Sequence, residues 1–580
     1  MSTEQNTRQF KHRWSYRTRI LASIPVFLIL IGTLTFASRM SAVSWSDQPM
    51  NRTIQTMTGN TAVKMVPTSH SLHCNTQESV VGQPGLCSVS LTSGVYKVAT
   101  KMLTFTATEP HTHDTQLIHL LLHYPIGDTG KMPGIIFISG AGTGSATGAY
   151  QDQADYYASA GFMAATVDKP VWNTTAITRN YPAMAHVYDH AISIMAQQKN
   201  VDPNAIGIHI DSESGWIDPY IQDFDHKIAF QVLASPMLFE PREAVAFFVA
   251  QDFSIVGANP GYQAMVRRIF SANFDMFGLT NANINPFTDK TFAIPTFLAY
   301  GSRDVLTSQV DGMMKIMEMA QKAGNTNFVL RDYPFADHIL RIGNGAAGDT
   351  TLADHYLQET LEWSAGIVKG YKQVAPKVAG HEIYQSIGLP KIHATKVGTL
   401  YFVILHCLLI LALLTSIIFS LIVLVKKIVA LVKKQKDPIA FVNGFGRVTL
   451  FMVIDSLLAF LLFIAAVAQI IWRVSLLGWG AAPIQPAGMI YWSWYVIQIA
   501  CVIVVWTWAR VIVNVIEAGA DRGWFHWFKR IAHEPIEPTV QSHNEPFFAT
   551  TKLGVTYFII LAVTMLLILL FFAFWGLFLY

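Results

Sequence analysis

The stretch that decides the fold spans residues 206–219 and reads IGIHIDSESGWIDP. Its alternating apolar residues predict a buried strand over 206–210, and a helix is expected to begin at Gly215 or Trp216. A tight turn joins the two elements and carries Ser212 at its top. A serine held on a sharp strand-to-helix turn is presented as a nucleophile. The stretch therefore predicts a reactive serine at the end of a sheet strand.

Two later segments supply an acid and a base. Residues 294–304 read IPTFLAYGSRD and end a predicted strand at Asp304, and residues 333–340 read YPFADHIL and place His338 after another strand. Upstream, residues 134–145 read GIIFISGAGTGS, a short buried strand that runs into a Gly-rich loop. This loop fits neither the GxGxxG frame nor the GxxxxGK[ST] frame of nucleotide sites. We therefore interpret it as a source of backbone N–H groups for an oxyanion.

The three motifs together resemble the α/β-hydrolase superfamily over about residues 98–370. Ser, Asp and His follow one another in the chain order that this fold uses. The segment VDPNAIGIHIDSESGWI is similar to the elbow pattern DPxxIGxxGHSxGGW of dienelactone hydrolases and prolyl-oligopeptidase-type enzymes, in register from Asp202 to Trp216. The resemblance implies a mostly parallel, eight-stranded sheet with a helical lid.

The resemblance also implies a set of site residues and a reaction. The reaction is hydrolysis of an ester or peptide bond through an acyl-enzyme, without a metal or another cofactor. The implied roles are nucleophile for Ser212, acid for Asp304, base for His338, and backbone oxyanion donors for Glu213 and for Ala141 or Gly142.

Two positions depart from the family pattern. Ile210 is bulky where a small residue is preferred two positions before the nucleophile, and Ser139 replaces the usual histidine before the oxyanion loop. A catalytically weakened domain that only binds its ligand therefore stays an alternative.

Residues 238–290 interrupt the alternation of strands and helices with aromatic-rich helical stretches, which predicts a lid. Its apolar side chains either receive an apolar substrate group or simply pack the lid on the core. They are Phe247, Phe248, Phe253, Phe270, Phe274, Met276 and Phe277.

Composition separates the middle of the chain from its ends. Of the 580 residues, 52% are hydrophobic and only 14% are charged, against about 25% charged in soluble domains. The surplus of apolar residues lies in five runs that are each long enough to cross a bilayer. The net charge of +3 is spread along the chain, so nucleic acid is not an expected partner. The predicted spans are 20–38, 397–425, 448–472, 489–509 and 553–579.

Basic residues predict how these spans are oriented. The segment 1–19 is basic and precedes an apolar run that is long for a cleaved signal peptide, which favours a signal anchor with 1–19 in the cytoplasm. The loops after the second and fourth spans are rich in Lys and Arg, whereas the loop 473–488 holds only Arg473. Because basic loops stay in the cytoplasm, we expect a multi-pass protein of the cell membrane. An extension (39–97), the hydrolase domain (98–370) and a linker (371–396) are expected to lie outside the cytoplasm. The remaining residues, 397–580, are expected to form a membrane region of four helices.

Two cysteines outside the spans and one acidic residue inside a span also have expected roles. Cys74 and Cys87 lie in the outer extension, and we predict a disulfide between them, with two free thiols as the alternative. On the chain-entropy model, such a bridge would stabilise the folded state by about 3 kcal/mol. Asp455 lies inside a span, where it either pairs with a neighbouring helix or serves transport. A transport or sensing module with an accessory hydrolase is therefore a further alternative.

Overall fold

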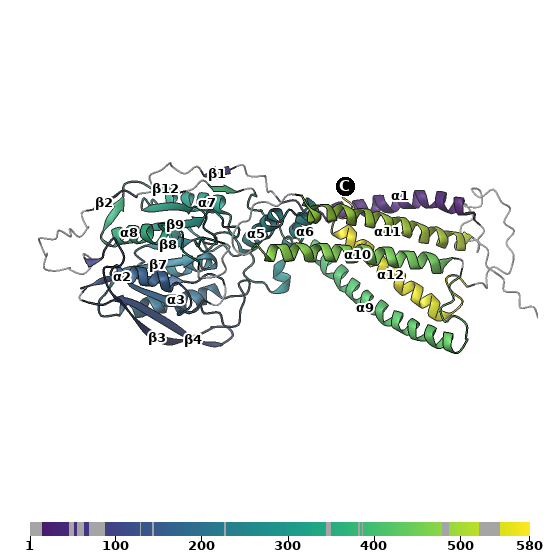
Figure 1. Cartoon of the computed structure of the whole chain (residues 1–580), viewed down its shortest axis with the longest axis horizontal. Coiled ribbons are helices and arrows are strands. Elements are labelled where there is room, and N and C mark those ends of the chain that lie inside the picture. The colour runs from purple at the N-terminus through teal and green to yellow at the C-terminus, as the bar shows by residue number, and fades with distance from the viewer. Residues whose placement is uncertain are drawn as a thin grey trace, which may run out of the picture.

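The computed structural model has a sheet domain at one end, a bundle of long helices at the other, and two shorter helices between them (Figure 1). The residues that it describes are 14–45, 52–54, 63–68, 88–127, 129–141, 144–224, 228–343, 350–380, 383–385, 387–442, 444–477, 487–520 and 546–579.

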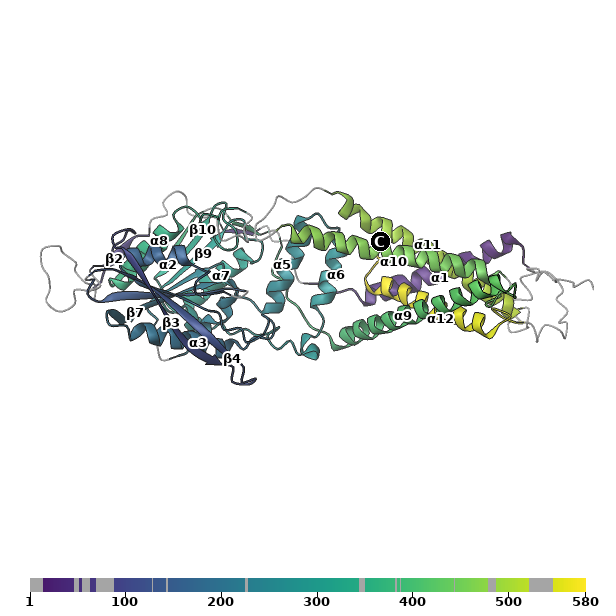
Figure 2. The same cartoon turned by 60° about the horizontal axis from the view of Figure 1, so that its bottom comes forward.

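The main sheet of the domain has nine strands in the order β12-β10-β9-β8-β7-β5-β6-β4-β3. All neighbouring pairs are parallel except β3 with β4 and β4 with β6. The two long strands β3 and β4 cross the edge of the sheet obliquely (Figure 2). The strands are β3 Val98–Thr108, β4 Thr115–Pro125, β5 Met132–Ile138, β6 Met163–Val167, β7 Val201–Asp211, β8 Gln231–Ala234, β9 Thr296–Gly301, β10 Phe328–Tyr333 and β12 Lys377–Gly380.

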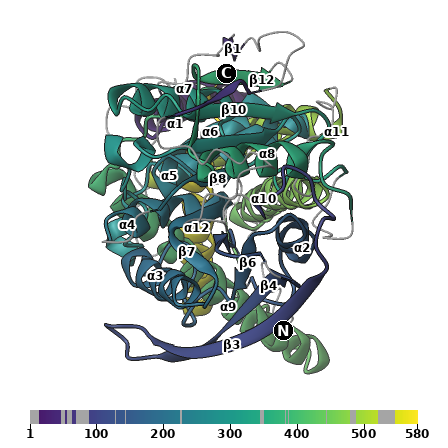
Figure 3. The same cartoon turned by 90° about the vertical axis from the view of Figure 1, so that its left-hand side faces the viewer.

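Helices cover both faces of this sheet, because its central strands are apolar on both sides. Alternate residues of β5 enter different clusters: Ile136 and Ile138 pack with α3, α4 and α7, whereas Ile135 and Phe137 pack with α2 and α8. Figure 3 shows the sheet between these helices. The helices are α2 Gln151–Ser159, α3 Tyr181–Ala196, α4 Asp218–Gln222, α7 Gln309–Lys322 and α8 Tyr356–Val368.

The prediction of eight strands was wrong by one strand. The segment 371–396, expected to be a linker, contributes β12, which pairs in parallel with β10 from Val329 to Asp332. This pairing satisfies backbone groups that would otherwise lie at an open sheet edge. The same segment ties down the N-terminal extension: β11 (Tyr371–Gln373) pairs with β2 (Met65–Pro67), and β13 (Ile383–Gln385) pairs with β1 (Arg52–Ile54).

Two helices, α5 (Pro241–Ile255) and α6 (Pro260–Phe270), form the insertion between β8 and β9. They lie between the sheet domain and the long helices (Figures 1 and 2). Tyr262 of α6 is fully buried, stacks edge-on against Trp494 with ring centroids 4.8 Å apart, and bonds to the Ser493 hydroxyl at 2.8 Å. The predicted lid region therefore packs against the bundle as well as against the domain.

Five helices in the described residues are long and apolar enough to cross a membrane. They overlap the predicted apolar runs, and the last helix is followed by a turn rather than continuing to residue 579. Asp455 accepts a hydrogen bond from Thr507 of the adjacent helix at 2.7 Å, which is the pairing alternative for this acid. The helices are α1 Tyr16–Met40, α9 Lys396–Val432, α10 Phe445–Ser475, α11 Met489–Ala520 and α12 Lys552–Phe574.

Cys407 and Cys501 are free thiols. Cys74 and Cys87, for which we predict a disulfide, lie outside the described residues.

Candidate active site

Ser212 stands at the sharp turn that the sequence predicts. It follows β7 directly and opens the short 3₁₀ helix η2 (Ser212–Trp216). Its φ of 50° is in the left-handed region, which is strained for a residue with a side chain. The Gly-rich loop approaches this turn so closely that a Cβ on Gly140 would lie 2.8 Å from the Ser212 Cβ. Only glycine at position 140 allows this approach.

The structure brings together the three residues that sequence reasoning named. His338, in the loop after β10, has its Nε2 atom 2.7 Å from the Ser212 Oγ. Its Nδ1 atom is 3.1 Å from Oδ2 of Asp304, which follows β9. The side chains thus form a hydrogen-bonded chain from hydroxyl to imidazole to carboxylate at the carboxyl ends of parallel strands.

The Asp304 carboxylate is fixed by its own loop. Its Oδ1 accepts hydrogen bonds from the backbone N–H groups of Leu306 at 2.8 Å and Thr307 at 3.3 Å, and the Thr307 hydroxyl donates to Oδ2. A carboxylate held in this way orients the imidazole and selects the tautomer with the proton on Nδ1.

Acidic groups around His338 set its charge. Burial disfavours the protonated imidazole, but the Asp304 carboxylate, with Asp211 and Asp337 nearby, outweighs burial and raises the pKa of His338 above its usual value. Asp211, next to the serine, accepts a hydrogen bond from the Tyr150 hydroxyl at 2.9 Å. Burial raises the pKa of Asp211 to about 6, against the opposing effect of His338. The His338 imidazole therefore lies among acidic groups whose charges favour its protonated form.

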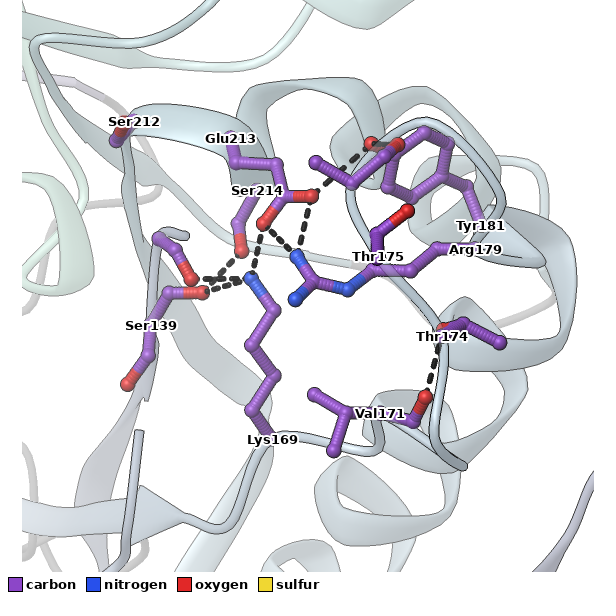
Figure 4. A network of polar contacts seen from close by, with 12 residues as sticks. Ser139, Lys169, Val171, Thr174, Thr175, Arg179, Tyr181, Ser212, Glu213 and Ser214 are labelled. Atoms are coloured by element: carbon purple, nitrogen blue, oxygen red, sulfur yellow. Dashed lines mark hydrogen bonds and ion pairs between the residues drawn. The ribbon is translucent and has the colours of Figure 1, made fainter. Parts of the chain in front are cut away.

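Beneath the serine lies a buried network of charges that sequence reasoning missed (Figure 4). The Glu213 carboxylate forms ion pairs with Lys169 at 2.7 Å and with Arg179, and accepts a hydrogen bond from Tyr181 at 3.1 Å. Burial alone raises the pKa of a carboxyl group, but Lys169 and Arg179 hold the pKa of Glu213 below its usual value. Ser212 shares the turn but lies apart from the drawn contacts (Figure 4).

This network holds the Gly-rich loop against the turn. The Lys169 ammonium group donates to the backbone oxygen of Ser139 at 3.1 Å and to that of Gly140. The Ser214 hydroxyl donates to the same Ser139 oxygen. Ser214 is thus a small, fully buried residue that joins the turn to the loop, whereas only Ser212 contacts the histidine.

The expected oxyanion donors lie on the two segments that this network joins. Glu213 is the second residue of η2, where backbone N–H groups have no partner inside the helix. Ala141 follows Gly140 in the loop and is exposed. Gly142, the other candidate for the second donor, lies outside the described residues.

Two residues near the turn have structural roles. Ile210 is fully buried and pairs with Ile138 and Leu233 on the neighbouring strands, so its bulk faces the core rather than the loop. His209 bonds to the Tyr356 hydroxyl at 2.7 Å, and burial lowers its pKa to about 3, which keeps this histidine neutral.

No family model matches this sequence, and no curated protein sequence matches it. Among solved structures, the chain is similar to carboxyl esterase 2 of the mycorrhizal fungus Tuber melanosporum, at 18% identity and a TM-score of 0.32, over 47% of this chain and 85% of that one. It is similar to Pyrococcus horikoshii acylaminoacyl peptidase at 12% identity and a TM-score of 0.28, over 46% of this chain and 40% of that one. It is also similar to a puromycin hydrolase at 15% identity and a TM-score of 0.33, over 51% of this chain and 42% of that one. The match thus spans less than half of the peptidase and of the puromycin hydrolase.

The topology of the sheet itself defines the fold. The third and fourth strands of the main sheet, β5 and β6, exchange places, so that β6 lies beside β4 and β5 lies beside β7. The turn with Ser212 follows the next strand, and Asp304 and His338 follow later strands in that order. Residues 98–380 of this chain form a domain with the α/β-hydrolase fold.

Proposed function

We propose that this protein is a membrane-anchored serine hydrolase that cleaves an ester or amide bond outside the cytoplasm. The observation that carries the proposal is the hydrogen-bonded chain from Ser212 through His338 to Asp304. A serine, an imidazole and a carboxylate in this contact order are the parts of an acyl-transfer site.

In the proposed reaction, the Ser212 oxygen attacks the substrate carbonyl while His338 Nε2 takes the hydroxyl proton. Asp304 stabilises the imidazolium that forms, without accepting its proton. The backbone N–H groups of Glu213 and of Ala141 or Gly142 donate to the developing oxyanion. The imidazolium then protonates the leaving group, and water activated by His338 releases the acid from Ser212.

Burial of the site favours a small substrate. Ser212 is 6% exposed and His338 is 3% exposed, so the surface of a folded protein does not reach the serine in this conformation. An ester or amide bond in a slender or flexible molecule could reach the serine despite this low exposure. The triad itself serves ester and peptide hydrolysis alike.

The outer location rests on the five apolar helices and on the distribution of basic residues between them. A reporter enzyme that is active only outside the cytoplasm should work when fused after residue 390 and should fail when fused after residue 435. The opposite pattern would overturn the orientation.

Labelling with a fluorophosphonate tests the hydrolase itself. The purified full-length protein should react, and peptide mapping should find the adduct on Ser212. Ser212→Ala should not react, whereas Ser214→Gly, on the same turn, should keep most of the labelling. A folded wild-type protein that never reacts would instead support the alternative of a domain that only binds its ligand.

A further inference from the structure

The Gly-rich loop after β5 is attached to the rest of the domain at both of its ends. At its start, the ammonium group of Lys169 binds the backbone oxygens of Ser139 and Gly140, as described above. At its end, the backbone N–H of the same Lys169 donates to the Gly144 oxygen at 2.9 Å. A Cβ on Gly144 would lie 2.3 Å from the Ser139 Oγ atom, so the two ends of the loop also lie against each other.

The attachment at the end of the loop includes a carboxylate, that of Asp168, which takes no part in the network around Glu213. Oδ1 of Asp168 accepts a hydrogen bond from the backbone N–H of Ala146 at 2.7 Å. Oδ2 accepts one from the backbone N–H of His119 on β4 at 2.9 Å, and the His119 Nδ1 atom lies within hydrogen-bond distance of the same oxygen. The loop therefore uses one oxygen of this carboxylate, and a sheet strand holds the other.

Ala146, the residue that Asp168 binds, is also held through its backbone oxygen. It is 1% exposed, and this oxygen accepts hydrogen bonds from the Thr166 hydroxyl at 2.5 Å and from the Gln151 side chain at 2.7 Å. Thr166 belongs to β6 and Gln151 is the first residue of α2. Loss of the Asp168 carboxylate would therefore loosen the end of the loop without detaching it.

The two attachments lie on either side of an expected oxyanion donor. Ala141 follows the first attachment directly and precedes the second, and it is exposed. A backbone N–H stabilises an oxyanion best when its direction is fixed before the reaction, because no energy is then spent on orienting it. A small displacement of such a group lowers the rate strongly. Fixing both ends of the loop therefore limits how far this donor can move.

We propose that Asp168 is a positioning residue of the hydrolase site, which holds the end of the Gly-rich loop so that the N–H donor of the loop faces the oxyanion. This role rests on the function proposed above. Asp168 acts through the loop and not on the substrate, since its oxygens are taken by Ala146 and His119. The role differs from that of Lys169, whose ammonium group holds the start of the loop.

Hydrolysis of a p-nitrophenyl ester by the full-length protein tests this role, with Asp155 as the matched control. Asp155 also pairs with a histidine of β4, His123, at 2.7 Å, but it lies on α2 and its hydrogen bond does not go to the loop. Asp168→Ala should lower kcat about ten-fold with little change in KM, whereas Asp155→Ala should keep the wild-type values. Asp168→Asn retains an oxygen that can accept from the Ala146 N–H, and should recover most of the kcat.

Hydrogen–deuterium exchange supplies a readout that does not depend on turnover. In Asp168→Ala, peptides that cover residues 144–149 should exchange faster than in the wild type, while peptides from β7 should exchange at the wild-type rate. Asp155→Ala should leave the exchange of 144–149 unchanged. Faster exchange of this segment with an unchanged kcat would overturn the proposal, because the carboxylate would then stabilise the loop without positioning a donor.

Other outcomes separate this role from misfolding and from the hydrolase function itself. Should Asp168→Ala fail to fold, Asp168→Glu, which keeps the charge but is longer by one methylene group, should show the fall in kcat; a folded Asp168→Glu with wild-type kcat would refute the role. Equal losses in the Asp168→Ala and Asp155→Ala variants would also refute it. A folded wild type that hydrolyses no ester would refute the hydrolase function, whereas an active wild type with an equally active Asp168→Ala would refute only the role of Asp168.

Discussion

Two buried cations, Lys169 under the serine turn and Arg268 at the junction of lid and bundle, have opposite surroundings. Lys169 donates to two backbone oxygens and to the Glu213 carboxylate. Arg268 donates to one backbone oxygen, and its buried Nε and Nη2 atoms have no hydrogen-bond partner among the described residues. The first cation is compensated by contacts within the fold, whereas the described residues leave most of the second cation's hydrogen-bonding capacity unused.

The largest expected effect belongs to the serine. Ser212→Ala should lower turnover by about 10⁶-fold, because the acyl-enzyme can no longer form. Hydrolysis of a p-nitrophenyl ester measures this loss. Ser214→Gly should change turnover far less, since Ser214 joins the turn to the loop without contacting His338. A similar loss in both variants would mean that disruption of the turn, and not removal of the Ser212 hydroxyl, causes the loss of turnover.

Lys169→Met should cause the next largest loss of activity. Without the ammonium group, the Gly-rich loop loses its tie to the turn, and we expect a loss of about 10²-fold in kcat with little change in KM, as when one oxyanion donor is removed. Breaking a buried ion pair should also lower the free energy of unfolding by about 3 kcal/mol, measured by denaturant titration. Lys322→Met is the control, because Lys322 forms an exposed ion pair with Glu318 on α7. An unchanged kcat in folded Lys169→Met would refute the positioning role.

The acids near His338 predict the pH dependence of hydrolysis. The reaction needs neutral His338, and its pKa is raised mainly by Asp304 against the effect of burial. Activity should therefore rise with pH through a pKa above the usual histidine value of about 6.5. Asp211→Asn removes one negative charge near the ring and should move this rise to lower pH. A rise at the same pH in wild type and variant would show that Asp211 does not influence the base.

Arg268→Gln should have the smallest effect on stability. In detergent solution it removes a buried charge that forms no ion pair with a carboxylate among the described residues, so the free energy of unfolding should rise by about 1 kcal/mol or remain unchanged. Lys169→Met, in contrast, should lower the free energy of unfolding clearly. A loss of 3 kcal/mol or more in Arg268→Gln would show that Arg268, like Lys169, is held by contacts within the chain.

Much of the fold and the three aligned side chains followed from local patterns. The elbow stretch and the two later strand ends identified Ser212, Asp304 and His338, because each lies within a few residues of the end of an apolar run. The strand β12 (Lys377–Gly380) was missed because its four residues do not alternate between apolar and polar side chains. It is recognised only by its pairing with β10, which lies far earlier in the chain.

The buried network was missed for a different physical reason. Lys169 and Arg179 lie well before Glu213 in the sequence, and nothing in their local patterns links them to it. Only the tertiary fold brings the three charges together. The doubt raised by Ile210 also needed the structure: close approach at the turn is provided by Gly140, whereas Ile210 faces the core.

The way in which the hydrolase domain is tied at both ends bears on its release by proteases. It is inserted between α1 and α9, and both helices belong to the same bundle: the Ser38 hydroxyl of α1 donates to the Ala573 backbone oxygen at 2.7 Å, and Ser416 of α9 bonds to Thr564 at 2.7 Å. Beyond the bundle, β1 and β2 of the N-terminal extension pair with β13 and β11 of the segment that leads to α9. A single cut after α1 therefore leaves the domain attached through α9. With the membrane anchoring proposed above, release of the domain would require cleavage on both sides of it.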